Sequence, residues 1–565
     1  MSHPNPSTAL ATVVIDELVR AGVSVFLSAP GSRSTALVLA VERHPGAELV
    51  MTIDERSAAF NALGRAKATG RPAAVITTSG TAAANLLPAV VEADLAETPL
   101  IVVTADRPTE LRGVGANQAI DQVGMFGRFV RRATDTGPAE PRAGAPGWWR
   151  SIISQSVASA RGFGARPGPV HLNVPFREPT VPVSDDGRTR DEPYLEATDG
   201  RTEDAPWTLT LTGRAPGREL VEEVTARIDR AEKGLIIAGG GASSASVAEL
   251  GRHLGWPVLA TAESGLRGRE DVITAGHHLV AHARPDLILR FGPPGPSRRI
   301  LDLIESEVDQ LVVGSGWSDP GRTACLMVDT DGAALAAALV TDTSERQSGE
   351  WLAWWETADR AVRQVLQPEL ERSFSEPAIA ARVGASEAEL LVVASSMPIR
   401  DVESYAFVVP HVVANRGASG IDGFISTALG ASAGVERPVA LAGDLSFLHD
   451  GNGFLTDPPG RSVFVVLDNQ GGGIFSFLPQ AQHIGPEFER LFGTPHHRDL
   501  AGLAEFHGVR HRDVESLVAL DDALQEGWKH TESSVIVARL DRQENVAEHD
   551  RLARLAAEAA MSVST

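Results

Sequence analysis

The stretch VALAGDLSFLHDGNGFLTDPPGRSVFVVLDNQGGGIFSFL, residues 439–478, decides the fold of this chain. Residues 439–442 form a short apolar run, 446–455 have the composition of a helix, and 462–467 are rich in the branched and aromatic residues of a strand. Strand, helix and strand in this order predict a right-handed crossover unit. In such a unit two parallel strands end side by side at one edge of the sheet.

Polar groups follow both of these predicted strands. Asp444 comes directly after the first strand, Asn469 follows the second, and Gly471 lies just beyond. A carboxylate, an amide oxygen and a glycine carbonyl at one edge suit a small hard cation such as Mg²⁺, which keeps positions for phosphate oxygens and water. The helix N-terminus beside Asp444 would add N–H donors for phosphate. The alternative is an ordinary crossover unit in which Asp444 caps the helix and the glycines make a turn.

Length and composition indicate a large soluble protein. A chain of 565 residues exceeds one core and predicts roughly three domains. The net charge of −22 argues against nucleic acid or an anionic membrane as the main partner. The first residues lack a basic stretch followed by an apolar core, and no window is apolar enough to span a membrane, so we expect a cytoplasmic protein. The single cysteine, Cys325, excludes intrachain disulfides and is expected to be a buried strand thiol.

The first third of the chain alternates apolar strands with helical segments. We expect strands at 23–27, 49–53, 73–77, 100–104 and 170–174, and a first helix over 7–22 capped by Ser7. This alternation predicts a doubly wound parallel sheet, which binds ligands at the C-terminal ends of its strands. The segments at those ends are 28–34, 54–56, 78–81 and 105–108.

Polar linkers suggest the domain boundaries. The predicted fold class is α/β, with three doubly wound parallel-sheet domains: an N-terminal domain over 1–182, a linker over 183–216, a central Rossmann-like domain over 217–342, and a C-terminal domain over 351–565. The central domain opens with a glycine-rich turn at 234–241. A nucleotide-binding regulatory module is therefore an alternative reading, but Ser244 stands where a dinucleotide fingerprint has its last glycine or alanine.

Seven motifs, all in the two outer predicted domains, resemble one enzyme family. They are SAPGSRS (28–34), DERSAAFNALGRAKATGRPAAVITTSGTAAANLLPAVVEA (54–93), TADRP (104–108), GANQAIDQ (115–122), NRGASGIDG (415–423), GDLS (443–446) and NQGGGIFSFLP (469–479). The family is 2-succinyl-5-enolpyruvyl-6-hydroxy-3-cyclohexene-1-carboxylate synthase, a thiamine diphosphate (ThDP) enzyme of menaquinone biosynthesis. The GDL sequence, in place of GDG, is usual in this branch of the ThDP enzymes.

The resemblance implies a cofactor, a metal and their ligands. Glu55 would be catalytic, because ThDP is activated through a carboxyl group hydrogen-bonded to its aminopyrimidine ring; alone, Glu55 would be read as a first-turn acid that complements a helix dipole. Asp444, Asn469 and the Gly471 carbonyl would hold Mg²⁺ (or Mn²⁺). The implied cofactor-binding residues are Glu55, Ser79, Gly80, Ile421, Gly443, Asp444, Leu445, Ser446, Asn469, Gly471, Gly473, Ile474 and Phe475.

The resemblance also implies substrate contacts. They are Ser32, Arg33, Arg107, Asn117, Gln118, Arg298, Ser396, Arg400, Arg416, Ile474, Phe475 and Leu478, with Arg298 standing where the family has a lysine. Four of these arginines fall on predicted strand-end loops of an acidic chain. Surface salt bridging could explain any one of them, but four at ligand-binding edges indicate a substrate with several carboxylates, which the guanidinium fork grips at two points.

The implied reaction is a ThDP- and Mg²⁺-dependent group transfer. 2-Oxoglutarate would lose CO₂, and the succinyl carbanion equivalent would add to the ring alkene of isochorismate in a conjugate addition. The resemblance further implies a homodimer or homotetramer with active sites at the subunit interface. The alternatives are another ThDP-dependent carboligase or decarboxylase of a dicarboxylic 2-oxo acid, and a ThDP-fold scaffold without activity.

Overall fold

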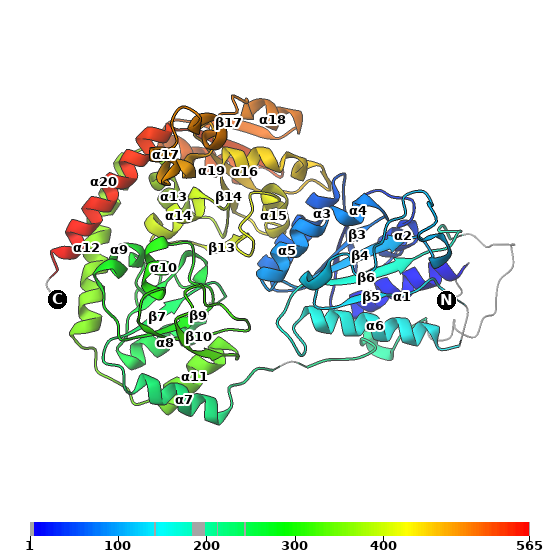
Figure 1. Cartoon of the computed structure of the whole chain (residues 1–565). Helices are drawn as coiled ribbons and strands as arrows, with labels where there is room; N and C mark the ends of the chain where they lie inside the picture. The colour runs from blue at the N-terminus through cyan, green and yellow to red at the C-terminus, as the bar shows by residue number, and fades with distance from the viewer. Residues whose placement is uncertain (1–4, 141–142, 183–197, 212, 242–243, 564–565) are drawn as a thin grey trace. The chain divides into compact units, whose positions relative to one another are not determined.

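The computed structural model of the chain describes residues 5–140, 143–182, 198–211, 213–241 and 244–563. Its strands form three sheets (Figure 1). The chain divides into two compact units: unit 1 comprises Met1–Thr212, Asn415–Gly434 and Phe447–Arg461, and unit 2 comprises Gly213–Ala414, Val435–Ser446 and Ser462–Thr565. The domain boundaries inferred from the sequence remain a prediction, and part of the predicted linker, 183–197 and 212, lies outside the described residues.

Unit 1 contains a seven-stranded sheet in the order β15-β2-β1-β3-β4-β6-β5, parallel except for β15. Its strands are β1 (Val25–Ser28), β2 (Glu48–Thr52), β3 (Ala73–Thr77), β4 (Leu100–Asp106), β5 (Ala133–Asp135), β6 (Val170–Pro175) and β15 (Thr456–Asp457). Its helices are α1 (Pro6–Arg20), α2 (Thr35–Glu42), α3 (Glu55–Thr69), α4 (Thr81–Ala84), α5 (Leu87–Leu95), α6 (Ala145–Ala160) and α15 (Phe424–Ala431).

Successive side chains along each strand point to opposite faces of this sheet, and this produces two hydrophobic cores, one on each face. In β1, Phe26 packs with α1, α2 and α6, while its neighbour Leu27 packs with α3 and α5 on the opposite face. Each face is apolar because helices cover both sides of a parallel sheet. The predicted doubly wound sheet is confirmed, but Asn5 rather than Ser7 caps α1, since the Asn5 side chain accepts the Thr8 N–H.

Two segments from late in the sequence complete unit 1. Helix α15 packs on α3 at very short range, because Gly64 faces the Thr427 carbonyl and Gly430 faces that of Asn61, where an added Cβ would lie 2.1 and 2.0 Å from the oxygens. Strand β15 pairs antiparallel with β2 at the edge of the sheet, with Thr456 opposite Thr52.

Unit 2 contains the other two sheets. The five-stranded sheet, in the order β11-β10-β9-β7-β8, consists of β7 (Gly234–Ala238), β8 (Val258–Ala260), β9 (Leu287–Phe291), β10 (Asp309–Val313) and β11 (Ala324–Val328). The six-stranded sheet, in the order β13-β12-β14-β16-β18-β17, consists of β12 (Leu390–Val393), β13 (His411–Ala414), β14 (Pro438–Gly443), β16 (Val463–Asp468), β17 (Arg510–Val514) and β18 (Ser534–Arg539). Both sheets are parallel throughout.

Helices cover both sheets of unit 2. Those that accompany the five-stranded sheet in sequence are α7 (Arg218–Ile228), α8 (Ala245–Leu254), α9 (Gly276–Leu279), α10 (Arg298–Ile304) and α11 (Gly332–Asp342). The remaining helices are α12 (Glu350–Arg372), α13 (Glu376–Gly384), α14 (Met397–Tyr405), α17 (Gln480–His483), α18 (Leu500–Phe506), α19 (Leu517–Lys529) and α20 (Arg542–Met561). Helices α12 and α20 lie side by side (Figure 1) and share a core with Leu235 and Ile237 of β7.

Two local expectations were wrong. The helix predicted over 446–455 is instead α16 (Asp444–His449) followed by a 3₁₀ turn, Gly451–Phe454. Buried Asp450 accepts the N–H of Ser426 in α15 at 2.8 Å, and this contact, with two glycines in the turn, outweighs local helix preference. Cys325 lies on β11 as expected, but it is exposed at the edge of its sheet. No helix within the described residues has both the length and the apolar character needed to cross a bilayer.

Candidate active site

The crossover unit of the six-stranded sheet places Asp444 and Asn469 at neighbouring strand ends. Strands β14 and β16 pair in parallel with Gly443 opposite Leu467, and the two polar residues follow directly. The Asp444 side chain is buried, its Oδ2 accepts the Gly471 N–H at 2.9 Å, and Nε2 of His496 lies 3.2 Å from the same oxygen. Asp444, Asn469 and Gly471 therefore come together in unit 2, although Gly471 approaches Asp444 through its N–H.

The orientation of the Asn469 amide fits a metal ion. Its Nδ2 donates to Oε1 of Glu376 at 2.8 Å, while its Oδ1 is buried and accepts no hydrogen bond within the described residues. A buried amide oxygen without a donor is uncommon, and beside a buried carboxylate it matches the hard oxygen ligands that Mg²⁺ prefers. One potential ligand atom from each of Asp444, Asp468 and His496 also lies within 4.8 Å of the others.

Electrostatics around this group favour a bound cation. Burial raises the pKa of Asp444 to about 6, against hydrogen bonds from His496 and the Gly471 N–H. Burial also raises the pKa of Glu376 to about 7, and the charge of Asp401 adds to the rise. Carboxyl groups that are difficult to ionise in the protein alone would be stabilised as carboxylates by a divalent cation.

Three residues here were missed by sequence reasoning. Asp468 could have been found, because it ends the same strand that Asn469 follows. His496 and Glu376 belong to no motif with metal-ligand spacing, and only the fold brings them to the site.

The glycine turn after β16 is held by close backbone packing. Gly471 has φ +147°, and a Cβ there would lie 2.0 Å from the Gly493 carbonyl oxygen, so only glycine fits. The turn leads into a 3₁₀ helix, Gly473–Phe477, which leaves Ile474 and Phe475 half-buried and Leu478 exposed. Apolar groups thus remain accessible beside the polar metal ligands.

Glu55 begins α3 at the end of β2 in unit 1. The neighbouring Asp54 caps this helix by accepting the N–H groups of Arg56 and Ser57, at 2.9 and 3.4 Å. Glu55 is half-buried, and its carboxylate makes no hydrogen bond or ion pair within the described part of the chain. Because Asp54 caps the helix, the carboxylate of Glu55 remains available for a ligand.

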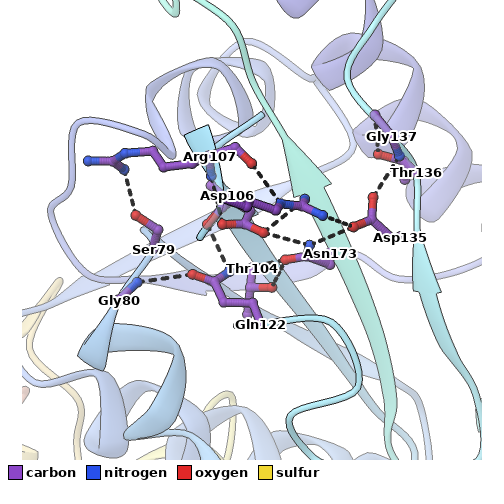
Figure 2. A network of polar contacts seen from close by, with 12 residues as sticks. Ser79, Gly80, Thr104, Asp106, Arg107, Gln122, Asp135, Thr136, Gly137 and Asn173 are labelled. Atoms are coloured by element: carbon purple, nitrogen blue, oxygen red, sulfur yellow. Dashed lines mark hydrogen bonds and ion pairs between the residues drawn. The ribbon is translucent and has the colours of Figure 1, made fainter. Parts of the chain in front are cut away.

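Arg107 is fixed at the end of β4 by the loops around it (Figure 2). Its Nη1 donates to the Ser79 hydroxyl at 2.5 Å. That hydroxyl donates to the Gln118 carbonyl at 2.9 Å, and the Gln118 amide donates back to the Ser79 carbonyl at 2.8 Å. Gln118 has φ +57°, a strained value for this residue, which the reciprocal pair of hydrogen bonds holds in place.

A buried polar network lies behind Arg107 (Figure 2). At its centre, Asn173 accepts from Thr104 and Gln122 through Oδ1, at 2.9 and 3.0 Å, and donates through Nδ2 to Asp106 and Asp135, at 2.9 and 3.1 Å. Gln122 in turn accepts the Gly80 N–H at 3.0 Å. The guanidinium of Arg112 pairs with both aspartates, at 2.9 and 2.7 Å. The network therefore links the Ser79–Gly80 loop to the end of β4.

Arg33 and Arg107 make this edge of unit 1 suitable for an anion. Arg33 donates to the Phe176 carbonyl and pairs with Glu178, both at 3.0 Å. Burial lowers the pKa of Arg107, and the positive charge of Arg33 lowers it further. Two neighbouring guanidinium groups that repel each other would be stabilised by a bound carboxylate.

The other residues that were predicted to contact the substrate or the cofactor lie in different surroundings. Ser396 has φ +78° before α14, and its carbonyl accepts from Arg400 at 2.6 Å. Arg416 and the exposed Ile421 lie on one loop of unit 1. Arg298 is exposed and pairs with Asp302 and Glu305, at 2.7 and 3.0 Å, so its present partners are acids of its own helix and of the residue that follows it.

The predicted residues divide between the two units. Unit 1 contains Ser32, Arg33, Glu55, Ser79, Gly80, Arg107, Asn117, Gln118, Arg416 and Ile421. Unit 2 contains Arg298, Ser396, Arg400, Gly443, Asp444, Leu445, Ser446, Asn469, Gly471, Gly473, Ile474, Phe475 and Leu478.

Comparisons with known proteins agree with this geometry. Residues 8–125 match the model for the thiamine pyrophosphate enzyme N-terminal TPP binding domain, and residues 404–538 match that for the C-terminal TPP binding domain. The crystal structure of benzoylformate decarboxylase from Polynucleobacter necessarius is similar in fold, with a TM-score of 0.71 at 17% identity over 96% of this chain and 99% of that one. The fold and the site define a thiamine diphosphate-dependent enzyme.

Similarity to curated relatives identifies the family. The 2-succinyl-5-enolpyruvyl-6-hydroxy-3-cyclohexene-1-carboxylate synthase of Saccharopolyspora erythraea is 41% identical over 97% of this chain and 98% of its own length. Those of Chloroflexus aurantiacus and Geobacillus thermodenitrificans are 40% and 39% identical, over 97% and 95% of this chain and 96% and 94% of their own lengths. The chain belongs to the 2-succinyl-5-enolpyruvyl-6-hydroxy-3-cyclohexene-1-carboxylate synthase family, the ThDP-dependent transferases of menaquinone biosynthesis.

Proposed function

We propose that this enzyme decarboxylates 2-oxoglutarate and transfers the four-carbon succinyl unit to isochorismate, releasing CO₂ and 2-succinyl-5-enolpyruvyl-6-hydroxy-3-cyclohexene-1-carboxylate. The observation that carries the proposal is the pair Arg33 and Arg107, two adjacent cations at the ligand edge of an acidic chain. Each substrate carries two carboxylates, the groups that guanidinium binds best.

The cofactor and metal would be held by residues already described. Bound ThDP supplies the nucleophilic carbon that decarboxylation of a 2-oxo acid requires. Glu55 would donate and accept a proton at the aminopyrimidine ring, a role for which its unpaired carboxylate is suited. Asp444, Asn469 and Gly471 would hold Mg²⁺ (or Mn²⁺) against the diphosphate, supported by the buried, unpaired Oδ1 of Asn469.

The two substrates would be distinguished by different arginines. Ser396 and Arg400 would contact the far carboxylate of 2-oxoglutarate. Arg33, Arg107 and Arg416 would bind the carboxylates of isochorismate. Ile474, Phe475 and Leu478 would cover the reacting carbons and exclude water, in keeping with their incomplete burial.

We also propose a homodimer or homotetramer whose active sites combine residues of two subunits. Large apolar side chains on unit 1, among them Ile53, Val114 and Val123, are 68%, 68% and 50% exposed. Apolar groups exposed this close to predicted site residues are typical of a surface that another subunit covers.

One assay tests the proposed reaction. CO₂ release from 2-oxoglutarate is measured with ThDP, Mg²⁺ and isochorismate, and with each omitted in turn; sustained turnover is expected only when all are present. Pyruvate in place of 2-oxoglutarate is the matched control and should be a poor donor. Equal turnover of pyruvate, or sustained turnover without isochorismate, would instead favour another ThDP-dependent carboligase or decarboxylase.

A further inference from the structure

The loop after β13, residues 415–423 with the sequence NRGASGIDG, carries two of the proposed ligand contacts in unit 1. Arg416 is half-buried and Ile421 is 37% exposed. The loop is rich in glycine, and Ser419 has φ +61°, so its own sequence does not fix one conformation. Its shape must therefore come from contacts with the rest of unit 1.

Glu92, in the second half of α5, supplies two of these contacts. Its side chain is buried, Oε1 accepts the Gly417 N–H at 2.9 Å, and Oε2 accepts the Ala418 N–H at 2.6 Å. One carboxylate thus binds two consecutive backbone N–H groups, which fixes the direction of the peptide immediately after Arg416. Hydrogen bonds to an ionised acceptor are the stronger kind and have little tolerance for displacement.

Lys67 of α3 ties the same carboxylate to the start of the loop. Its Nζ lies 2.7 Å from Glu92 Oε1 and donates to Asn415 Oδ1 at 3.1 Å. The Asn415 amide then donates to the hydroxyl of Thr427 in α15 at 2.9 Å. The ammonium group of Lys67 therefore pairs with the buried carboxylate of Glu92 that holds the loop.

The backbone of the loop packs closely against α5. A Cβ added to Gly417 would lie 2.7 Å from the Glu92 carbonyl oxygen and 2.8 Å from the Ala96 nitrogen. The loop therefore rests directly on the helix backbone, and Glu92 sits within this contact. Its carboxylate points to the loop that bears Arg416 and Ile421.

From these contacts we infer that Glu92 is a positioning residue, which presents Arg416 to a substrate carboxylate and Ile421 to the cofactor. The inference rests on the proposed function for the identity of those ligands. It assigns Glu92 no contact with substrate, cofactor or the reacting atoms.

The first experiment needs no catalytic activity. Amide hydrogen exchange is followed by mass spectrometry in peptides covering 415–423, in the wild type, in Glu92→Gln and in the control Glu97→Gln. Glu97 follows the same helix, and its carboxylate lies 4.0 Å from the guanidinium of Arg166. Exchange of the Gly417 and Ala418 amides should rise about tenfold or more in Glu92→Gln only. Unchanged exchange in that variant would overturn the inference.

The second experiment asks whether Glu92 acts through Arg416. In a double-mutant cycle on kcat/KM for isochorismate, Glu92→Gln should lower the value about tenfold and Arg416→Ala more. The double variant should lose less than the product of the two single losses, because Arg416 is no longer present to be positioned and only the effect through Ile421 remains. Losses that multiply would show that Glu92 acts elsewhere.

Two further outcomes separate this inference from the proposed function. A wild type that turns over neither substrate refutes the proposed reaction, and hydrogen exchange together with ThDP affinity then decides the role of Glu92. If Glu92→Gln does not fold, Lys67→Met is used: it removes the cation and leaves the carboxylate, so a smaller rise in exchange at the same two amides is expected. No rise there would also overturn the inference.

Discussion

Replacing Asn173 by aspartate changes one nitrogen atom to oxygen at the centre of the network behind Arg107. Oδ1 would keep its two donors, Thr104 and Gln122. At the Nδ2 position, however, an oxygen would face the carboxylates of Asp106 and Asp135, which accept hydrogen bonds there at 2.9 and 3.1 Å. The substitution keeps the size and shape of the side chain, but it replaces the donor in the two contacts with Asp106 and Asp135 by an acceptor.

The loss can be estimated from those contacts. Two hydrogen bonds to charged acceptors contribute roughly 1.5–3 kcal/mol each, so Asn173→Asp should destabilise unit 1 by at least about 3 kcal/mol before repulsion is counted. For a cooperative unit of this size that corresponds to a fall in Tm of roughly 6–12 °C. Burial and two neighbouring carboxylates would hold the pKa of the introduced carboxyl above its usual value. The penalty should therefore be largest above that pKa and shrink as the pH falls and the group is protonated.

The assay is thermal unfolding of the wild type and Asn173→Asp between pH 5 and pH 8, with Asn85→Asp as a control for the same change at an exposed site. The difference in Tm should be greatest at pH 8 and decrease steadily toward pH 5. In parallel, kcat/KM should fall at pH 8, because the network supports the Ser79–Gly80 loop and Arg107. A difference in Tm below 2 °C at pH 8, or one that grows on acidification, would refute the assignment of donors and acceptors around Asn173.

Three other predictions concern catalysis and stability. Mixing inactive Glu55→Gln with inactive Asp444→Ala should restore part of the activity through hybrid oligomers, and no recovery after verified subunit exchange would count against shared sites. Arg400→Ala should lower kcat/KM for 2-oxoglutarate about 10–150-fold and leave a monocarboxylic donor such as 2-oxobutyrate nearly unchanged; equal losses would mean that its hydrogen bond to the preceding loop is its whole role. Although burial opposes the charge of His549, Asp401 at 2.7 Å raises its pKa to about 9. The pair should therefore stabilise the fold by up to about 3 kcal/mol below pH 6.5, and this contribution should be lost as the pH rises through 9. A difference in stability between wild type and His549→Gln that does not shrink over that range would contradict the pairing.

Elements that are marked by a short local run of apolar residues could be predicted from the sequence alone. Strand β3 was predicted at 73–77 and is found there, because a fully buried parallel strand is a short apolar run between turn signals. The convergence of Asp444 and Asn469 also followed from the sequence, since parallel strands joined by a crossover must end at one edge.

The errors and omissions arise from contacts between residues distant in sequence. The end of the predicted 446–455 helix is replaced by a turn because Asp450 binds the backbone of Ser426. Glu376 orients Asn469 from 93 residues away, and His496 reaches Asp444 from 52 residues away. No spacing rule connects such pairs, so they could be found only in the folded chain.

The pairing of β15 with β2 has a consequence for synthesis of the protein. Strand β2 emerges from the ribosome early, but Thr456, which covers its outer edge opposite Thr52, is made about 400 residues later. At roughly 5–20 residues per second the nascent chain waits about 20–80 s with that edge open, and the surface of α3 that α15 covers is bare for nearly as long. An uncovered strand edge recruits other strands, so the nascent N-terminal region should depend on chaperones during translation. A fragment ending at residue 212 should aggregate when expressed alone, whereas the same fragment supplied with a separate 415–461 peptide should remain in solution.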